Sequence, residues 1–247
     1  ATITKSGVVL YNETSEDNVT MASLDTTYIP LPDFVPDSYE AGSYEFDYTL
    51  ISDSVDDFPN DNELGSTFLI NDSLFSYGKM DAATGNPIGE TYFTPGGHVD
   101  GEKVQQCYAF VDANAHKVNV KGLTFSVAAN QDMTGLEMVI FAYQWNNEFD
   151  DLNDPNFDIT DDSVEELDAG AFTYTSDDLQ FENVYVPFDE VLTLEDNVRY
   201  LFCVTYFDGG VFLGYNNPDL DYDLTINSYL QPLWPLEDVD AWFWAGF

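Results

Sequence analysis

A strict alternation of apolar and polar residues in segment 42–50 constrains the fold of this chain more than any other feature. Tyr44, Phe46 and Tyr48 fall on one face of an extended strand, and Glu45 falls on the other. Similar short segments, bounded by Gly, Pro, Asn and Asp, recur along most of the sequence. No long stretch has the 3.6-residue period of an amphipathic helix. The sequence therefore predicts an all-β protein.

The predicted strands fall into two groups, which indicates two domains. In the first group, 42–50 and 66–70 resemble a hairpin with a long acidic connection. Upstream of it, 7–11 and 19–24 are further candidate strands. Far downstream, 162–167 is the best helix candidate of the chain, although a surface turn suits it better. The second group has short, regularly spaced strands, as in a jelly-roll-like double sheet. Its predicted strands are 105–111, 117–127, 136–145, 171–174, 184–194, 199–207, 211–215, 224–230 and 241–247.

We therefore expect two tandem antiparallel β-sandwiches. The first occupies residues 1–78, and the second, jelly-roll-like sandwich occupies residues 105–247. Segment 79–104 between them is rich in Gly, Pro and Thr, as a linker would be.

The net charge excludes several classes of partner. The chain has 46 Asp and Glu against 6 Lys and Arg, which gives a formal charge of −40. Such a field repels nucleic acids and anionic membranes, whose binding requires clustered Lys and Arg. Because the acids are scattered between apolar runs, they indicate the solvated surface of a folded body and not a disordered acidic tail.

Neither a membrane span nor a leader is visible in the sequence. No window approaches the ~18 consecutive apolar residues of a membrane helix, and no signal peptide opens the chain. The last residues, 242–247, have the composition of a buried strand. We therefore expect the chain to be part of a longer polypeptide.

Three acid-rich loops are candidate Ca²⁺ sites. Ca²⁺ is bound by carboxylate, amide and backbone oxygens, which such loops supply. None of the loops has EF-hand spacing, and plain surface acidity is the alternative in so acidic a chain. The candidates are the loop at 148–162, with Asp150, Asp151, Asn153, Asp154 and Asp158, the loop at 53–63, with Asp56, Asp57 and Asp61, and the loop at 219–223.

Cys107 and Cys203 are the only cysteines, and each lies within an apolar β-pattern. In an exported protein they would form one disulfide, closing a loop of about a hundred residues. Two free, buried thiols are the alternative. A redox or nucleophilic role is not expected, since no Cys-x-x-Cys motif or neighbouring His would lower a thiol pKa.

Catalytic motifs are absent from the sequence. His98 and His116 are both expected in exposed loops, and no Gly-x-Ser-x-Gly motif is present. A glycosidase requires two carboxyl groups at a suitable separation, but 46 acids make such pairs uninformative. We therefore expect a protein that is not an enzyme.

Aromatic residues offer a second kind of binding site. Trp145 precedes two asparagines and Trp234 lies between two prolines, so both are expected in loops, where they could stack on sugar rings. Filling the hydrophobic core is the alternative for both residues, and the favoured one for Trp242 and Trp244.

Several of these segments resemble a family of large secreted bacterial proteins. Gly42-Ser43-Tyr44, the acidic loop ending in Pro59-Asn60-Asp61-Asn62, and the strand around Phe68 resemble the closing hairpin of immunoglobulin-like adhesion-related modules. The strands at 184–188 and 200–204 resemble a β-sandwich that follows such modules in type IX secretion cargo. Asp-Ser/Thr motifs, such as Asp53-Ser54-Val55, resemble an O-glycosylation sequon of the same bacteria.

The resemblance implies an immunoglobulin-like first domain and an extracellular or cell-surface location. We expect a non-catalytic adhesion or structural module that is stabilised by Ca²⁺. Its expected partners are other domains of the same polypeptide, or surface glycans and proteins, with no nucleic acid and no membrane insertion. A carbohydrate-binding module of a secreted enzyme is the alternative function, and a glycoside hydrolase is the least favoured.

Overall fold

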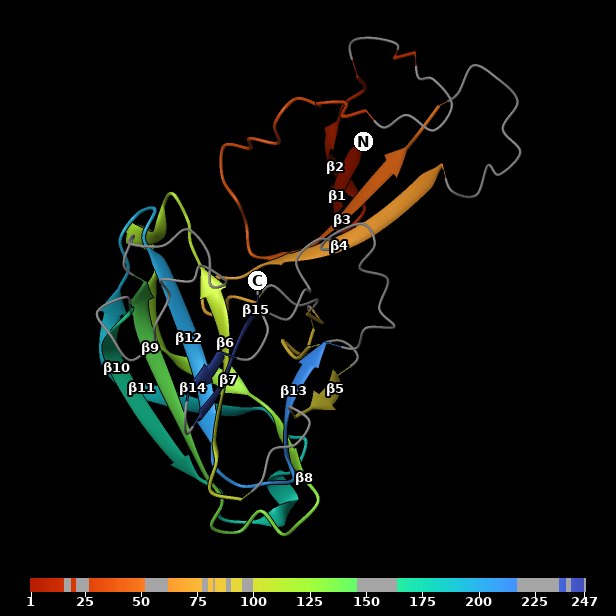
Figure 1. The fold of residues 1–247 in the computed structure, drawn as a ribbon. Coiled ribbons are helices and arrows are strands. Elements are labelled where there is room, and N and C mark those ends of the chain that lie inside the picture. The colour runs from red at the N-terminus through yellow and green to blue at the C-terminus, as the bar shows by residue number, and fades with distance from the viewer. Residues whose placement is uncertain are drawn as a thin grey trace. The chain divides into compact units, whose positions relative to one another are not determined.

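The protein is all-β in the computed structural model (Figure 1), as the sequence predicted, with several antiparallel sheets consistent with β-sandwich architecture. The structure describes residues 1–15, 19–20, 27–51, 62–76, 80–81, 83–87, 90–94, 100–145, 164–216, 236–238 and 241–246. Within these ranges, none of the helices has the length and hydropathy needed to cross a membrane. The chain divides into two compact units. Unit 1 comprises Ala1–Gly89 with Asn216–Thr225, and unit 2 comprises Glu90–Tyr215 with Ile226–Phe247.

Unit 1 contains a four-stranded antiparallel sheet in the order β2-β1-β3-β4. A two-residue turn joins β1 to β2, and Ser6 (φ 51°) and Gly7 (φ 76°) both have positive φ, as a type I′ turn requires. Glycine adopts this conformation without steric cost, so the sequence Lys-Ser-Gly-Val suits a tight hairpin. The strands are β1 (Thr2–Lys5), β2 (Val8–Asn12), β3 (Gly42–Thr49) and β4 (Glu63–Ile70).

The register of these strands gives the sheet one apolar face. Phe46 lies opposite Ile3 on β1, and Tyr44 lies opposite Phe68 on β4. Because directly opposed residues share a face, these four apolar side chains lie on the same side of the sheet. Glu45, which alternates with them along β3, is exposed on the other side. The face assignment made from segment 42–50 is therefore confirmed.

Unit 2 is built on a six-stranded sheet in the order β10-β9-β12-β6-β15-β14. Neighbouring strands are antiparallel except for β15, which pairs with β6 in parallel. Figure 1 shows β10, β9, β12 and β6 as long neighbouring arrows. The strands are β6 (Lys103–Phe110), β9 (Glu137–Trp145), β10 (Val164–Thr173), β12 (Arg199–Tyr206), β14 (Leu236–Asp238) and β15 (Ala241–Gly246).

Two smaller sheets accompany the six-stranded sheet in unit 2. A large hydrophobic core includes Ile140 of β9, Phe202 of β12, Phe125 of β7 and Val186 of β11. Ile140 and Val186 are 0% exposed. One smaller sheet pairs β7 (Asn119–Phe125) with β11 (Val184–Thr193), and the other contains β5 (Glu90–Phe93), β13 (Val211–Asn216) and β8 (Val127–Ala129).

Glycine permits a close approach between β10 and β11. A Cβ atom at Gly170 would collide with the carbonyl oxygen of Pro187. A similar collision, with the carbonyl oxygen of Val186, would occur at Gly122 on β7. These two glycines let backbones of neighbouring strands pack closer than any side chain would allow.

Three segments differ from the sequence-based expectations. The predicted linker 79–104 contains β5 and the first two residues of β6. Residues 164–167, expected in a short helix or surface turn, belong to β10 because 164–166 pair with β9, and this pairing overrides their weak local preference. Strand β1 was missed, because four residues ending in Lys5 give too little alternation to recognise.

Candidate functional site

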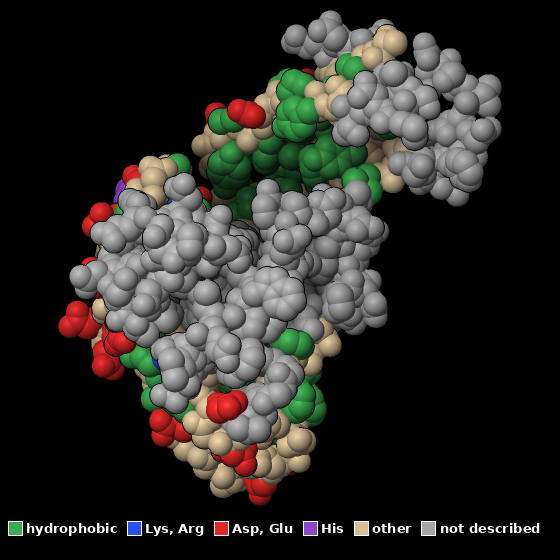
Figure 2. All heavy atoms as spheres, in the orientation of Figure 1, with side chains coloured by type: hydrophobic (Ala, Val, Ile, Leu, Met, Phe, Trp, Pro, Cys, Tyr) green, Lys and Arg blue, Asp and Glu red, His purple; other side chains and the backbone are tan. Residues whose placement is uncertain are grey.

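An aromatic face on the unit 1 sheet is a partly accessible apolar surface with regular geometry. We define the aromatic face as Tyr44, Phe46 and Tyr48 of β3 with Phe68 of β4. The Tyr44 and Phe68 rings stack at 5.0 Å with an interplanar angle of 10°, and the Phe46 and Tyr48 rings meet edge to face at 4.2 Å. Figure 2 shows hydrophobic side chains gathered over the strands of this unit.

Exposure changes along the aromatic face. Tyr44 is 2% exposed, whereas Tyr48 is 41% exposed and Phe68 is 39% exposed. A ring that is about 40% exposed retains apolar surface for a ligand, while its buried part holds the ring in place. The face therefore combines fixed rings with accessible surface.

Lysine and glutamate fix the buried end of the aromatic face. The Lys5 ammonium lies 5.3 Å from the centre of the Tyr44 ring and 3.1 Å from the Glu40 carboxylate. The Tyr44 hydroxyl donates to the Glu40 backbone carbonyl at 2.7 Å. A cation over a ring, an ion pair and a hydrogen bond together hold Tyr44 in one orientation.

A second aromatic group packs beside Tyr11 in the same unit. The Phe34 ring meets Tyr11 at 5.9 Å and Tyr39 at 6.0 Å, both edge to face. Hydroxyl groups anchor this group to the backbone, since Tyr11 donates to the Pro32 carbonyl and Tyr39 donates to the Phe34 carbonyl. Tyr39 is 55% exposed.

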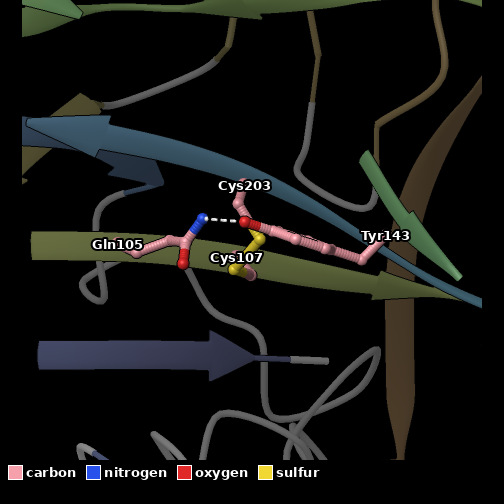
Figure 3. Close-up of a disulfide and its surroundings, with 4 residues drawn as sticks. All are labelled: Gln105, Cys107, Tyr143 and Cys203. Atoms are coloured by element: carbon pink, nitrogen blue, oxygen red, sulfur yellow. Dashed lines mark hydrogen bonds between the residues drawn. A yellow bond between two sulfur atoms is a disulfide. The ribbon is translucent and has the colours of Figure 1, made fainter. Parts of the chain in front are cut away.

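Cys107 and Cys203 form a disulfide in unit 2 (Figure 3), which is one of the two alternatives that the sequence left open. The two residues lie directly opposite each other on β6 and β12. Cys203 is fully buried, in a cluster with Leu201 and Tyr143. This cluster lies on the face of the six-stranded sheet opposite the large core, because Cys203 and Leu201 alternate with Phe202 along β12.

Polar groups are embedded in the same face beside the disulfide. Gln105 is 2% exposed, and its side-chain amide donates to the Tyr143 hydroxyl at 3.0 Å. Figure 3 shows this hydrogen bond beside the two sulfur atoms. Burial raises the pKa of Tyr143 to about 12, and the hydrogen bond from Gln105 opposes that rise. The phenol therefore stays neutral at physiological pH and acts here as a structural acceptor.

The structure corrects the expected position of Trp145. This residue is the last residue of β9, not a loop residue, and it is 2% exposed. The Arg199 guanidinium lies 4.8 Å from the centre of the indole ring. The ring is therefore a packing element in this structure, without the open face that sugar stacking requires. Trp234, the other candidate for sugar stacking, lies outside the described residues.

The predicted Ca²⁺ ligands also lie outside the described residues. They are Asp56, Asp57, Asp61, Asp150, Asp151, Asn153, Asp154 and Asp158, and the loop at 219–223 lies outside them as well. Among the residues that the structure does describe, no group of three or more His, Cys, Asp or Glu side chains could hold a metal ion.

His116 is an exposed residue of a short 3-10 helix, Ala115–Lys117, and contacts Asp196. The ring Nδ1 is 2.6 Å from a carboxylate oxygen of Asp196, and the His116 backbone N–H donates to the same oxygen. These hydrogen bonds, the backbone one first, lower the pKa of Asp196. The pair joins two surface segments, and in the described part of the chain it belongs to no group of three or more possible metal ligands.

The aromatic face was only partly visible from the sequence. The alternation in 42–50 assigned Tyr44, Phe46 and Tyr48 to one face, but it could not show how far that face is exposed. Exposure depends on what packs against a strand, which local periodicity does not encode. The aromatic residues that the sequence proposed as ligand contacts, Trp145 and Trp234, were chosen for their flanking residues instead.

Comparison with known proteins adds no relative to this picture. No family model matches the chain, and no curated protein or solved structure is significantly similar to it.

Proposed function

We propose that this chain is a non-catalytic module of a secreted or cell-surface protein, and that it acts in adhesion through the aromatic face of unit 1. The observation that carries the proposal is the partial exposure of Tyr48 and Phe68 on a sheet whose neighbouring ring, Tyr44, is fixed. Exposed apolar surface of this kind marks interaction sites on folded proteins. Rigid, partly buried rings bind at a low entropic cost.

An extracellular location is supported by the disulfide and the charge. Disulfides persist in oxidising compartments and are rare in the cytosol of most organisms. A net charge of −40 keeps a β-rich body soluble and suits an environment that supplies salt or divalent cations.

The domain types, the partners and the Ca²⁺ sites in this proposal rest on the sequence. Unit 1 would be an immunoglobulin-like module and unit 2 a jelly-roll-like module, as in type IX secretion cargo. The partners would be other domains of the same polypeptide, or surface glycans and proteins. Ca²⁺ would bind in the acidic loops and stabilise the fold.

Binding of surface glycans is the second candidate function. The edge-to-face pair of Phe46 and Tyr48 favours it, because partly exposed rings on a sheet pack against the C–H faces of sugars. In this form of the proposal, the aromatic face takes the role that the sequence gave to Trp145 and Trp234.

Binding to arrays of immobilised extracellular proteins and glycans tests the proposal. The Tyr48→Ala/Phe68→Ala variant should lose binding, because it removes the exposed rings. Tyr185→Ala is the matched control, since Tyr185 is 54% exposed on β11 of unit 2 and should be dispensable. Signal confined to glycans selects the second candidate. Equal binding by the double variant and the wild type would contradict a role for the aromatic face.

Metal removal tests the Ca²⁺ proposal separately. Addition of EDTA at constant ionic strength should lower the melting temperature, and re-addition of Ca²⁺ should restore it. Mg²⁺ at the same concentration is the control for screening of the negative charge. An unchanged melting temperature would contradict a structural Ca²⁺ site.

A further inference from the structure

Strand β2 is an exposed, uncharged edge of the unit 1 sheet. It pairs with β1 and ends the strand order on that side. Val8 is 61% exposed, Val9 is 57% exposed and Leu10 is 44% exposed. Edge strands of soluble proteins usually carry charged residues such as Lys, a Pro or a β-bulge, each of which hinders further pairing. The sequence of β2, Val-Val-Leu-Tyr-Asn, contains no charged residue and no Pro, and its one irregularity is the register shift opposite Ile3 and Thr4 of β1.

The backbone of β2 has groups directed away from β1. Ala1 and Glu13 exchange two backbone hydrogen bonds, of 2.7 and 3.0 Å, so they form a hydrogen-bonded pair. Positions alternate along an antiparallel ladder, so Asn12 directs its N–H and C=O outward. At the other end of β2, Lys5 and Val8 flank the two-residue turn and form a hydrogen-bonded pair. The next residue, Val9, therefore directs its N–H and C=O outward.

Two carboxylates act on Tyr11 of β2, whereas Lys5, which pairs with the Glu40 carboxylate, lies opposite Val8. Burial raises the pKa of Tyr11 on β2, and the carboxylates of Glu13 and Asp33 raise it further. Both carboxylates therefore act on this edge, and the whole chain carries −40. A second copy of the same chain would bring the same charge to the edge and would be repelled.

We propose that the β2 edge is a strand-addition site that takes an extended peptide carrying Lys or Arg at alternate positions. The backbone of the added strand would pair with Val9 and with Asn12, which lie on either side of the register shift in β2. Its apolar side chains would extend the apolar side of the sheet next to Val8, and its basic side chains would meet the negative field. This site is separate from the aromatic face and goes beyond the adhesive role proposed above.

Titration of a fluorescent ten-residue peptide of alternating Lys and Val tests this inference. The full chain should raise the anisotropy of the peptide, and the affinity should fall as salt is added. Isotope-edited infrared spectroscopy of the ¹³C-labelled peptide should show a shift to β-structure on binding. A peptide of alternating Glu and Val is the charge-reversed control and should bind at least tenfold more weakly.

Proline substitution separates strand addition from plain charge attraction. Val9→Pro removes an outward N–H, which an edge strand tolerates, and should weaken binding at least tenfold. Thr67→Pro is the matched control on the opposite edge strand, β4. Leu50 donates to the Asn62 carbonyl, so alternation from Asn62 makes Thr67 an outward position. This variant should bind within twofold of the wild type.

Three results would overturn the inference. Equal affinity of wild type and Val9→Pro for the Lys-Val peptide would show that the peptide binds through charge elsewhere. Equal binding of the Lys-Val and Glu-Val peptides would show that the site does not select basic side chains. Self-association of the wild type in sedimentation, lost in Val9→Pro, would assign the edge to a second copy. All three outcomes leave the test of Tyr48 and Phe68 unaffected, so failure here is distinct from failure of the adhesive proposal.

Discussion

The two main sheets of this protein differ in what their faces contact. In the unit 1 sheet, the apolar face is buried at Tyr44 but about 40% exposed at Tyr48 and Phe68. In the unit 2 sheet both faces are buried at the strands β9 and β12, since Ile140 on one face and Leu201 on the other are each 0% exposed. The comparison indicates that the unit 2 sheet is closed on both sides at its centre, whereas the apolar face of the unit 1 sheet is partly open.

The difference in burial between the two sheets corresponds to a difference in the sequence patterns of their strands. Strand β12 is buried at every position after Arg199, and its sequence runs Tyr-Leu-Phe-Cys-Val without a charge. Strand β3 alternates rings with charges. A strand buried on both faces has a nearly continuous apolar run, whereas a strand with one solvated face alternates. The predictions below test whether the energetics follow the same division.

Removal of the disulfide should have the largest effect, and it should be confined to unit 2. The Cys107→Ala/Cys203→Ala variant opens a crosslink between residues 96 apart, which costs about 4–5 kcal/mol by chain entropy. All four tryptophans fall in the ranges of unit 2, so their fluorescence during urea unfolding reports on this unit. Reduced wild-type protein is the control and should match the variant. An unchanged unfolding midpoint would show that the disulfide does not stabilise unit 2.

Equivalent truncations in the two sheets should differ severalfold. Leu201→Ala leaves a cavity in a closed face and should cost about 3 kcal/mol. Phe68→Ala removes a ring that is 39% exposed and should cost about 1 kcal/mol. Hydrogen exchange followed by mass spectrometry measures both losses in the same chain, on peptides from β12 and from β4. Equal losses would contradict the division between a closed and an open sheet.

Tyr143 should make unit 2 sensitive to alkaline pH. Its pKa is about 12 in the folded state against 10.0 ordinarily, so the unfolded state loses its proton first as pH rises. The contribution is fully present below pH 10 and is lost as pH rises from 10 to 12, by about 2–3 kcal/mol in total. Denaturation curves of wild type and Tyr143→Phe at several pH values should converge over this window. Parallel curves would show that Tyr143 does not titrate with a raised pKa.

Much of the fold could be predicted because β-patterns are local. The strands around Tyr44, Ile140 and Phe202 were recognised from apolar runs and alternation. Pairing was not predictable in the same way. The parallel pairing of β15 with β6, and the β-structure at 164–167, depend on contacts between residues far apart in sequence.

The candidate site was predicted less well than the fold. Alternation placed Tyr48 on the right face but could not show that it stays exposed. Trp145 was expected in a loop because two asparagines follow it, yet its pairing with Val164 and Arg199 makes it the end of a central strand. The pairing of Cys107 with Cys203 stayed open at the sequence level because composition alone does not give the register of two strands.

Hydroxyl-radical footprinting of the free protein is the most direct test of the contrast between the two sheets. It measures the solvent access of individual aromatic side chains in solution. The structure predicts rapid oxidation of Tyr48 and Phe68, and strong protection of Trp145 and Tyr200, which are each 2% exposed. Protection of Tyr48 and Phe68 to the level of Trp145 would contradict an open aromatic face on unit 1 and, with it, the proposed site of adhesion.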